Sequence, residues 1–176
     1  MVSRIRKACF FSLILAAWIF SDSAMAARFS NQSLKGSYAA SIDGIYTFID
    51  KNPVALPAWF TGVVEVDGKG KITSFTGTFN IGACIVVSHE GDGIYEVNSN
   101  GTAIATVNLK AEPISLPSSE CPDNVIRVIS SMSKSNIVKF SLAIQNTKAV
   151  YGSILSKTDP SGKPVGFGGS LTAFKQ

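Results

Sequence analysis

The chain has 176 residues, of which 45% are hydrophobic and 16% charged, and a formal net charge of +4. This length fits a single domain. Part of the charge belongs to an N-terminal leader, whose removal takes away three basic residues and one acidic residue and leaves +2. No Lys/Arg cluster remains to follow a nucleic-acid backbone, which argues against nucleic acid as a partner.

The first 26 residues have the pattern of a signal peptide. Basic residues precede an apolar run over 10–20, and a small-x-small motif follows at 24–26. The run is shorter than the roughly 20 residues that span a bilayer, although a retained anchor is the alternative. We predict cleavage after Ala26, export to the periplasm or outside the cell, and one domain over 27–176.

The remaining sequence alternates between β-rich runs and turn residues. Asp67-Gly68 and Asn100-Gly101 each lie between two such runs and predict tight hairpins, because glycine tolerates positive φ. Composition predicts a further turn at 89–93 and loops at 50–57 and 111–124. We expect strands at 34–42 with a continuation over 45–48, then at 59–66, 71–79, 81–87, 94–97, 102–109, 125–132, 137–145, 149–156 and 165–174.

About eight to ten strands with short connections, and no helix of ordinary length, predict an all-β fold. We favour a closed antiparallel up-and-down β-barrel, with a two-sheet β-sandwich as the alternative. Closure removes sheet edges, and glycines inside strands fit tight barrel corners. In the first hairpin, alternation predicts two sets of side chains that share a face: Phe60, Val64 and Val66 in one arm, and Thr73, Phe75 and Phe79 in the other.

Two cysteines, Cys84 and Cys121, lie beyond the leader, whereas Cys9 falls within it. An even number of cysteines in an exported chain predicts a disulfide. A metal-binding pair or a reactive thiol is the alternative, but the sequence has a single histidine and no CxxC spacing.

Several motifs resemble those of a group of small exported, largely uncharacterised bacterial β-barrel proteins. These motifs are Leu-Lys-Gly-Ser-Tyr at 34–38, the turn at 67–73, Gly-Ile-Tyr-Glu-Val at 93–97 and Gly-Ser-Leu-Thr at 169–172. The resemblance implies a lipocalin-like or allene-oxide-cyclase-like barrel over most of the chain. It implies no catalytic residues, because the motifs are turns and strand edges.

His89, Glu90 and Asp92 form one local cluster of potential metal ligands. In a turn, the three side chains could converge on a cation; the alternative is a solvated turn, because a lone histidine rarely completes a site. We therefore expect no metal and no other cofactor, and keep this cluster as a weak candidate.

Aromatic residues on the strands are candidates for contact with a small apolar ligand inside the barrel. Core packing is the alternative for most of them. The candidates are Trp59, Phe60, Phe75, Phe79 and Tyr95. Small residues on the same strands would leave room for a ligand: Gly62, Gly77, Ala103, Ala105 and Gly152.

The sequence thus favours a secreted, non-enzymatic barrel that binds a small apolar ligand or a partner surface. The alternative is a cyclase- or isomerase-like enzyme acting on a lipid-like substrate, with Glu65 or Glu96 as its carboxylate. A third possibility is an eight-stranded outer-membrane barrel. We expect no stable membrane insertion, since several predicted strands are shorter than the roughly 9–11 residues needed to cross. The oligomeric state stays open.

Overall fold

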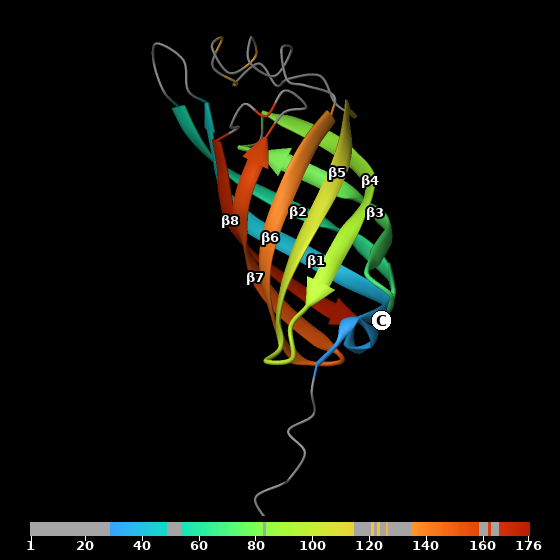
Figure 1. Ribbon diagram of the computed structural model, residues 1–176. Coiled ribbons are helices and arrows are strands. Elements are labelled where there is room, and N and C mark those ends of the chain that lie inside the picture. The colour runs from blue at the N-terminus through green and yellow to red at the C-terminus, as the bar shows by residue number, and fades with distance from the viewer. Residues whose placement is uncertain are drawn as a thin grey trace, which may run out of the picture.

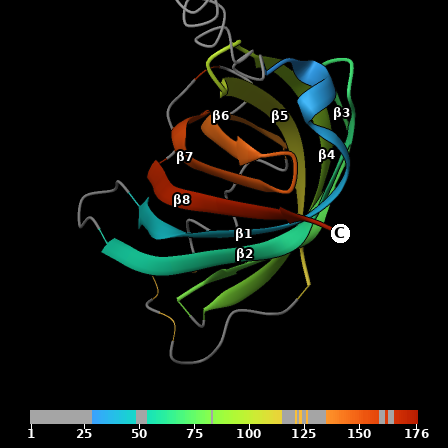
Figure 2. The same cartoon turned by 90° about the horizontal axis from the view of Figure 1, so that it is seen from below.

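A computed structural model describes residues 29–48, 54–82, 84–114, 121, 123, 126, 135–158, 162 and 166–176. Within these residues, eight antiparallel strands follow one another in chain order and close into a barrel, β8 pairing with β1 (Figure 1). Seen along its axis, the barrel is a ring of strands (Figure 2). The predicted up-and-down barrel is confirmed. The predicted signal peptide lies outside the described residues.

Most of the strands are longer than the sequence suggested. They are β1 (Lys35–Phe48), β2 (Val54–Asp67), β3 (Lys71–Ile81), β4 (Ile85–Val97), β5 (Thr102–Pro113), β6 (Ser135–Asn146), β7 (Ala149–Thr158) and β8 (Gly166–Lys175), preceded by a 3-10 turn, η1 (Asn31–Ser33). In the described part of the chain, no helix is long and apolar enough to cross a membrane.

The two ends of the barrel differ in their connections. The tight turns after β2, β4 and β6 lie at the end that also carries η1 and the C-terminus, which we call the η1 end (Figure 1, bottom). There, Asp67 Oδ1 accepts hydrogen bonds from the backbone N–H groups of Lys69 (2.7 Å) and Lys71 (2.9 Å), while Gly68 has φ 79°. Both predicted hairpins are confirmed.

The opposite end, which we call the disulfide end, carries the Cys84–Cys121 bond. Their Cα atoms lie 5.0 Å apart and both side chains are buried. The predicted disulfide is confirmed. Most of the predicted loop at 111–124 lies outside the described residues, although Ala111 to Pro113 continue β5.

The predicted turn at 89–93 is wrong, because this segment lies within β4. Gly91 pairs with Leu109 and Gly93 with Val107 of β5, and neither glycine has a positive φ. Turn-forming composition was therefore misleading, since ladder pairing holds both glycines extended.

Two other boundaries were also wrong. β2 begins at Val54, so the predicted loop at 50–57 ends earlier; Pro57 pairs with Ile45 of β1 but lies beyond the last β2–β3 pair, Ala58 with Ile81. In the predicted strand at 125–132, the one described residue, Ile126, has helical backbone.

A β-bulge in β3 changes which side chains face inward. Val66 pairs with Ile72 and Glu65 pairs with Ser74, which leaves Thr73 as the extra residue. As a result Ile72 and Phe75 are both buried, whereas Thr73 is exposed. The prediction that Thr73 shares the face of Phe75 was wrong, because a bulge shifts the period-2 alternation by one residue.

A second bulge acts on β7 in the same way. Phe140 pairs with Ile154 and Lys139 pairs with Ser156, so Leu155 is the extra residue and is 57% exposed. Beyond the bulge, Lys157 points into the barrel and is only 5% exposed. Unbroken alternation from Ile154 would have placed this lysine outside.

Three phenylalanines cross the barrel interior and form what we call the Phe layer: Phe60, Phe75 and Phe140. The Phe60 and Phe75 rings stack at 4.9 Å, and those of Phe75 and Phe140 at 6.5 Å. The Phe60 ring also covers the paired glycines Gly62 and Gly77, where an added Cβ would lie 2.5 and 2.6 Å from its Cζ. The space predicted for a ligand at these glycines is therefore filled by Phe60.

Candidate functional site

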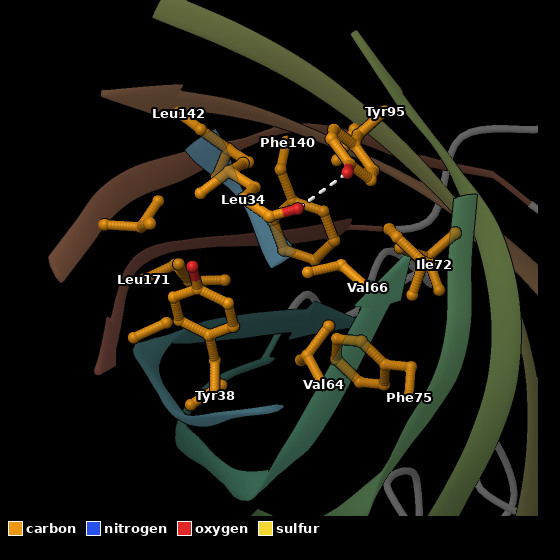
Figure 3. A pocket seen from close by; sticks show the side chains of 15 residues that line it. Leu34, Tyr38, Val64, Val66, Ile72, Phe75, Tyr95, Phe140, Leu142 and Leu171 are labelled. Atoms are coloured by element: carbon orange, nitrogen blue, oxygen red, sulfur yellow. Dashed lines mark hydrogen bonds between the residues drawn. The ribbon is translucent and has the colours of Figure 1, made fainter. Parts of the chain in front are cut away.

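Between the Phe layer and the η1 end lies a cavity of about 70 Å³, which we call the η1-end cavity (Figure 3). All eight strands contribute side chains to its wall, and Leu34 adds one from the segment before β1. The wall includes Ala40, Phe75, Phe140 and Leu171. Its volume exceeds the roughly 10–15 Å³ that a single water needs, so the cavity has room for a small molecule.

The two hydroxyl groups in this wall are already bonded to the backbone. Tyr95 donates to the carbonyl oxygen of Leu34 (2.7 Å; Figure 3) and to that of Asn31 (3.0 Å). Tyr38 donates to the carbonyl oxygen of Thr147 (3.2 Å). Burial raises the pKa of both tyrosines, so they remain neutral. The cavity therefore presents an apolar surface. The hydrogen bonds of Tyr95 also connect η1 to the rim of the barrel.

On the other side of the Phe layer is a smaller hollow of about 20 Å³, which we call the Lys157 pocket. Lys157, His89, Phe79 and Phe167 line it together with aliphatic side chains. Phe75 and Phe140 line both hollows, so the Phe layer separates an apolar space from one that contains ionisable groups.

The Lys157 ammonium lies among three aromatic rings. Its Nζ is 4.9 Å from the ring centroid of Tyr46, 5.7 Å from that of Phe167 and 5.8 Å from that of Phe79. Ring faces attract a cation, which partly offsets the cost of taking it out of water. Burial nevertheless lowers the pKa of Lys157 to about 8.

His89 faces the same pocket from β4. Burial, and secondarily the charge of Lys157, lower the pKa of His89 to about 4, so the imidazole is neutral near pH 7. Its ring packs edge-to-face against Phe79 at 5.6 Å. Its Nδ1 is buried and has no hydrogen-bond partner.

The structure does not bring the predicted metal ligands together. Because they lie on a strand and not in a turn, His89 points inward while Glu90 and Asp92 are exposed. In the described residues, no group of three or more His, Cys, Asp or Glu side chains is placed to hold a metal ion.

The aromatic candidates divide between the two hollows and the outer surface. Tyr95 lines the η1-end cavity, Phe60 and Phe79 line the Lys157 pocket, and Phe75 lines both. Trp59 lies on the outer face, 40% exposed, because it alternates with Phe60 along β2.

The carboxylates considered for an enzyme lie outside the barrel. Glu65 on β2 and Glu96 on β4 are both exposed, next to inward-facing Val64 and Tyr95. Neither can reach a substrate in either hollow, so the enzymatic alternative loses its two named residues.

Sequence reasoning missed Lys157 altogether. The predicted strand ended at Ser156, and a lone lysine at a strand end ordinarily faces solvent. The available signal was the Ile154-Leu155 pair, whose two consecutive large apolar residues interrupt the alternation before Lys157.

No family model, curated protein or solved structure matches this chain. The barrel implied by the resemblance to small exported bacterial proteins is present. Membership of that group stays a prediction.

Proposed function

We propose that this protein is an exported barrel that binds a small apolar molecule in the η1-end cavity. The cavity of about 70 Å³, with no free polar group among the described residues of its wall, is the observation that carries the proposal. An apolar cavity of about 150 Å³ takes up benzene or xenon, so one of about 70 Å³ suits a guest of the size of xenon. The disulfide supports export, since such bonds persist in oxidising compartments.

The distribution of polarity supports a barrel surrounded by water. Charged side chains such as Glu90, Asp92 and Lys110 are exposed on the outer face, while the buried residues are mostly apolar, with His89, Asn136 and Lys157 as the described exceptions. Outer-membrane barrels have the opposite arrangement. Strand length no longer contributes to this argument, because the strands have 10 to 14 residues and not the shorter lengths predicted.

Xenon is a suitable probe, and methyl NMR of the purified protein detects its binding. We expect shifts at methyl groups around the cavity, such as those of Val66 and Leu171, and none at Val87 near the disulfide end. Shifts spread evenly over the surface, or no shifts at all, would contradict the proposal.

Ala40→Leu is designed to fill the cavity, and Ala39→Leu is its matched control. Ala40 lines the cavity, whereas its neighbour Ala39 is exposed on the outer face. We expect Ala40→Leu to weaken xenon binding roughly tenfold or more and Ala39→Leu to leave it unchanged. Ala173→Val, a smaller change in the same wall, guards against loss of folding.

A further inference from the structure

The barrel directs a lysine into its own interior. Without the extra residue Leu155, Lys157 would face solvent; with it, the ammonium is buried among aromatic and aliphatic side chains. An unpaired charge in such surroundings is unfavourable. Bulges that re-aim a side chain are over-represented next to functional sites.

Lys157 has no counter-charge in the described part of the chain. Its contacts there are the three ring faces, and its pKa is lowered by burial. The acidic side chains that the structure describes are all exposed or half-exposed: Asp43, Glu65, Asp67, Glu90, Asp92, Glu96, Glu112 and Asp123. A negative group brought in from outside would supply what these residues do not.

His89 adds a second polar group to the same pocket. It comes from β4, whereas Lys157 comes from β7, and the charge of Lys157 acts on the imidazole. The imidazole hydrogen-bonds to the backbone of Val87, and its buried Nδ1 has no hydrogen-bond partner. The ammonium of Lys157 is therefore the group in this pocket that favours a negatively charged ligand.

We propose that the Lys157 pocket binds a carboxylate, with Lys157 supplying the counter-charge and the neutral imidazole of His89 lining the same pocket. Charge-assisted bonds from an ammonium to a carboxylate are among the strong ones. This inference does not require the η1-end cavity to be occupied, so it goes beyond the proposed function.

The size of the pocket limits the ligand. About 20 Å³ is slightly more than one water requires, so a carboxyl group enters only when the lining side chains shift. The chain of a longer acid would have to displace Phe75 or Phe140 to enter the η1-end cavity. A free short acid and the head group of a longer one share the same chemistry, and the experiment below distinguishes them.

The direct test measures the pKa of Lys157 by NMR of its Cε and Nζ nuclei, with and without acetate. Among the described residues, the other titratable groups facing Lys157 are His89, whose pKa is about 4, and Tyr46, whose pKa is raised above its usual value, so neither titrates near pH 8. A carboxylate that binds the charged amine more tightly than the neutral amine raises the pKa of Lys157. We expect a rise of about one unit or more at saturating acetate, a tenfold preference.

Sodium chloride at the same ionic strength is the control for simple anion binding. An equal rise with chloride, or no rise with acetate, would overturn the proposal. This measurement uses the unmodified protein and therefore does not depend on any variant folding.

Lys157→Met removes the charge and keeps a chain of similar length. We expect it to weaken acetate binding about tenfold or more, while Lys139→Met, which removes an exposed lysine from the outer face of β6, leaves binding unchanged. His89→Phe keeps an aromatic ring and should weaken binding by a smaller factor. Wild-type affinity in Lys157→Met would overturn the proposal.

Chain length separates the two sources of the carboxylate. If octanoate binds more tightly than acetate and displaces xenon, the pocket holds the head group of a longer acid; equal affinities indicate a short acid. Xenon binding that persists while acetate leaves Lys157 unaffected would reject this inference alone, and absence of xenon binding with a normal acetate response would reject only the proposed function.

Discussion

The η1-end cavity and the Lys157 pocket are built on the same strands, and Phe75 and Phe140 belong to the walls of both. At the η1 end, the inward hydroxyls of Tyr38 and Tyr95 are bonded to the backbone, so the space beside them is apolar. At the disulfide end, a bulge brings in Lys157 and leaves it without a carboxylate among the described residues.

This difference shows how one barrel can hold two kinds of interior. At the η1 end, strand alternation and the bulge at Thr73 both turn hydrophobic residues inward. In β7, the extra residue Leu155 instead turns a charged side chain inward, and its cost to folding suggests a role in binding. The predictions below test this contrast between the two ends.

The largest effect is expected where the two hollows meet. Phe140→Ala should lower the free energy of unfolding by about 3–5 kcal/mol, because it removes a buried ring that packs on both sides. Urea denaturation measures the loss. Phe140→Leu, which retains most of the volume, is the control and should lose less; a loss below about 1 kcal/mol for the alanine variant would mean that the layer is not a packed partition.

Removing the disulfide should act on stability without changing the η1-end cavity. The double substitution Cys84→Ser and Cys121→Ser should cost about 2–4 kcal/mol, because the cross-link between residues 37 apart no longer restricts the unfolded chain. Guanidinium denaturation measures the cost, and the reduced wild-type protein is the control. Loss of xenon binding under native conditions would show that the two ends are not independent.

Stability should depend on pH through the Lys157 pocket. The pKa of Lys157 is about 8 in the folded protein and 10.5 in the unfolded chain, so the unfolded state binds more protons between these values. The free energy of unfolding therefore rises with pH across this window, by roughly 3 kcal/mol from this group, until ionisation of Tyr46 in the unfolded chain opposes it near pH 10. Urea denaturation at pH 7, 8 and 9.5 measures the rise.

Lys157→Met should abolish that rise, whereas the control variant Lys139→Met should keep the wild-type dependence of stability on pH. On the acid side, His89 gives a second window: its folded pKa of about 4 lies below the unfolded value of 6.5, so stability falls as pH drops through this range. His89→Phe should flatten that fall. A profile unchanged by both variants would show that neither group is buried as described.

The smallest effect is expected at the η1 end. Tyr95→Phe removes a hydroxyl that donates to two backbone carbonyls and should cost about 1 kcal/mol. Tyr38→Phe removes one longer hydrogen bond and should cost less. Thermal unfolding of the two variants compares them directly. If both variants lost the same stability, the second hydrogen bond of the Tyr95 hydroxyl, which connects η1 to the rim of the barrel, would contribute nothing to stability.

Local sequence signals predicted much of the fold. The hairpin turns at Asp67 and Asn100 depend on residues within a few positions, and β-rich runs predicted the sheet class. The segment at 89–93 failed because its glycines suit either a turn or a strand. Only pairing with β5 decides between the two conformations.

The contents of the interior were less predictable. Alternation correctly placed Phe60, Phe75 and Phe79 inside and, followed strictly, would have placed Trp59 outside. It could not reveal Lys157, because a bulge depends on the register of β7 against β6 and not on β7 alone.

By itself, the sequence determined the all-β class, the hairpin turns at Asp67 and Asn100 and the disulfide, all of which follow from local backbone preference or from the number of cysteines. Closure into a barrel and not a two-sheet sandwich depended on the pairing of β8 with β1. The tertiary structure decided the position of the bulges, the separation of the two hollows by the Phe layer and the burial of Lys157 opposite His89. These features depend on strand register, which is fixed by packing between residues far apart in the chain.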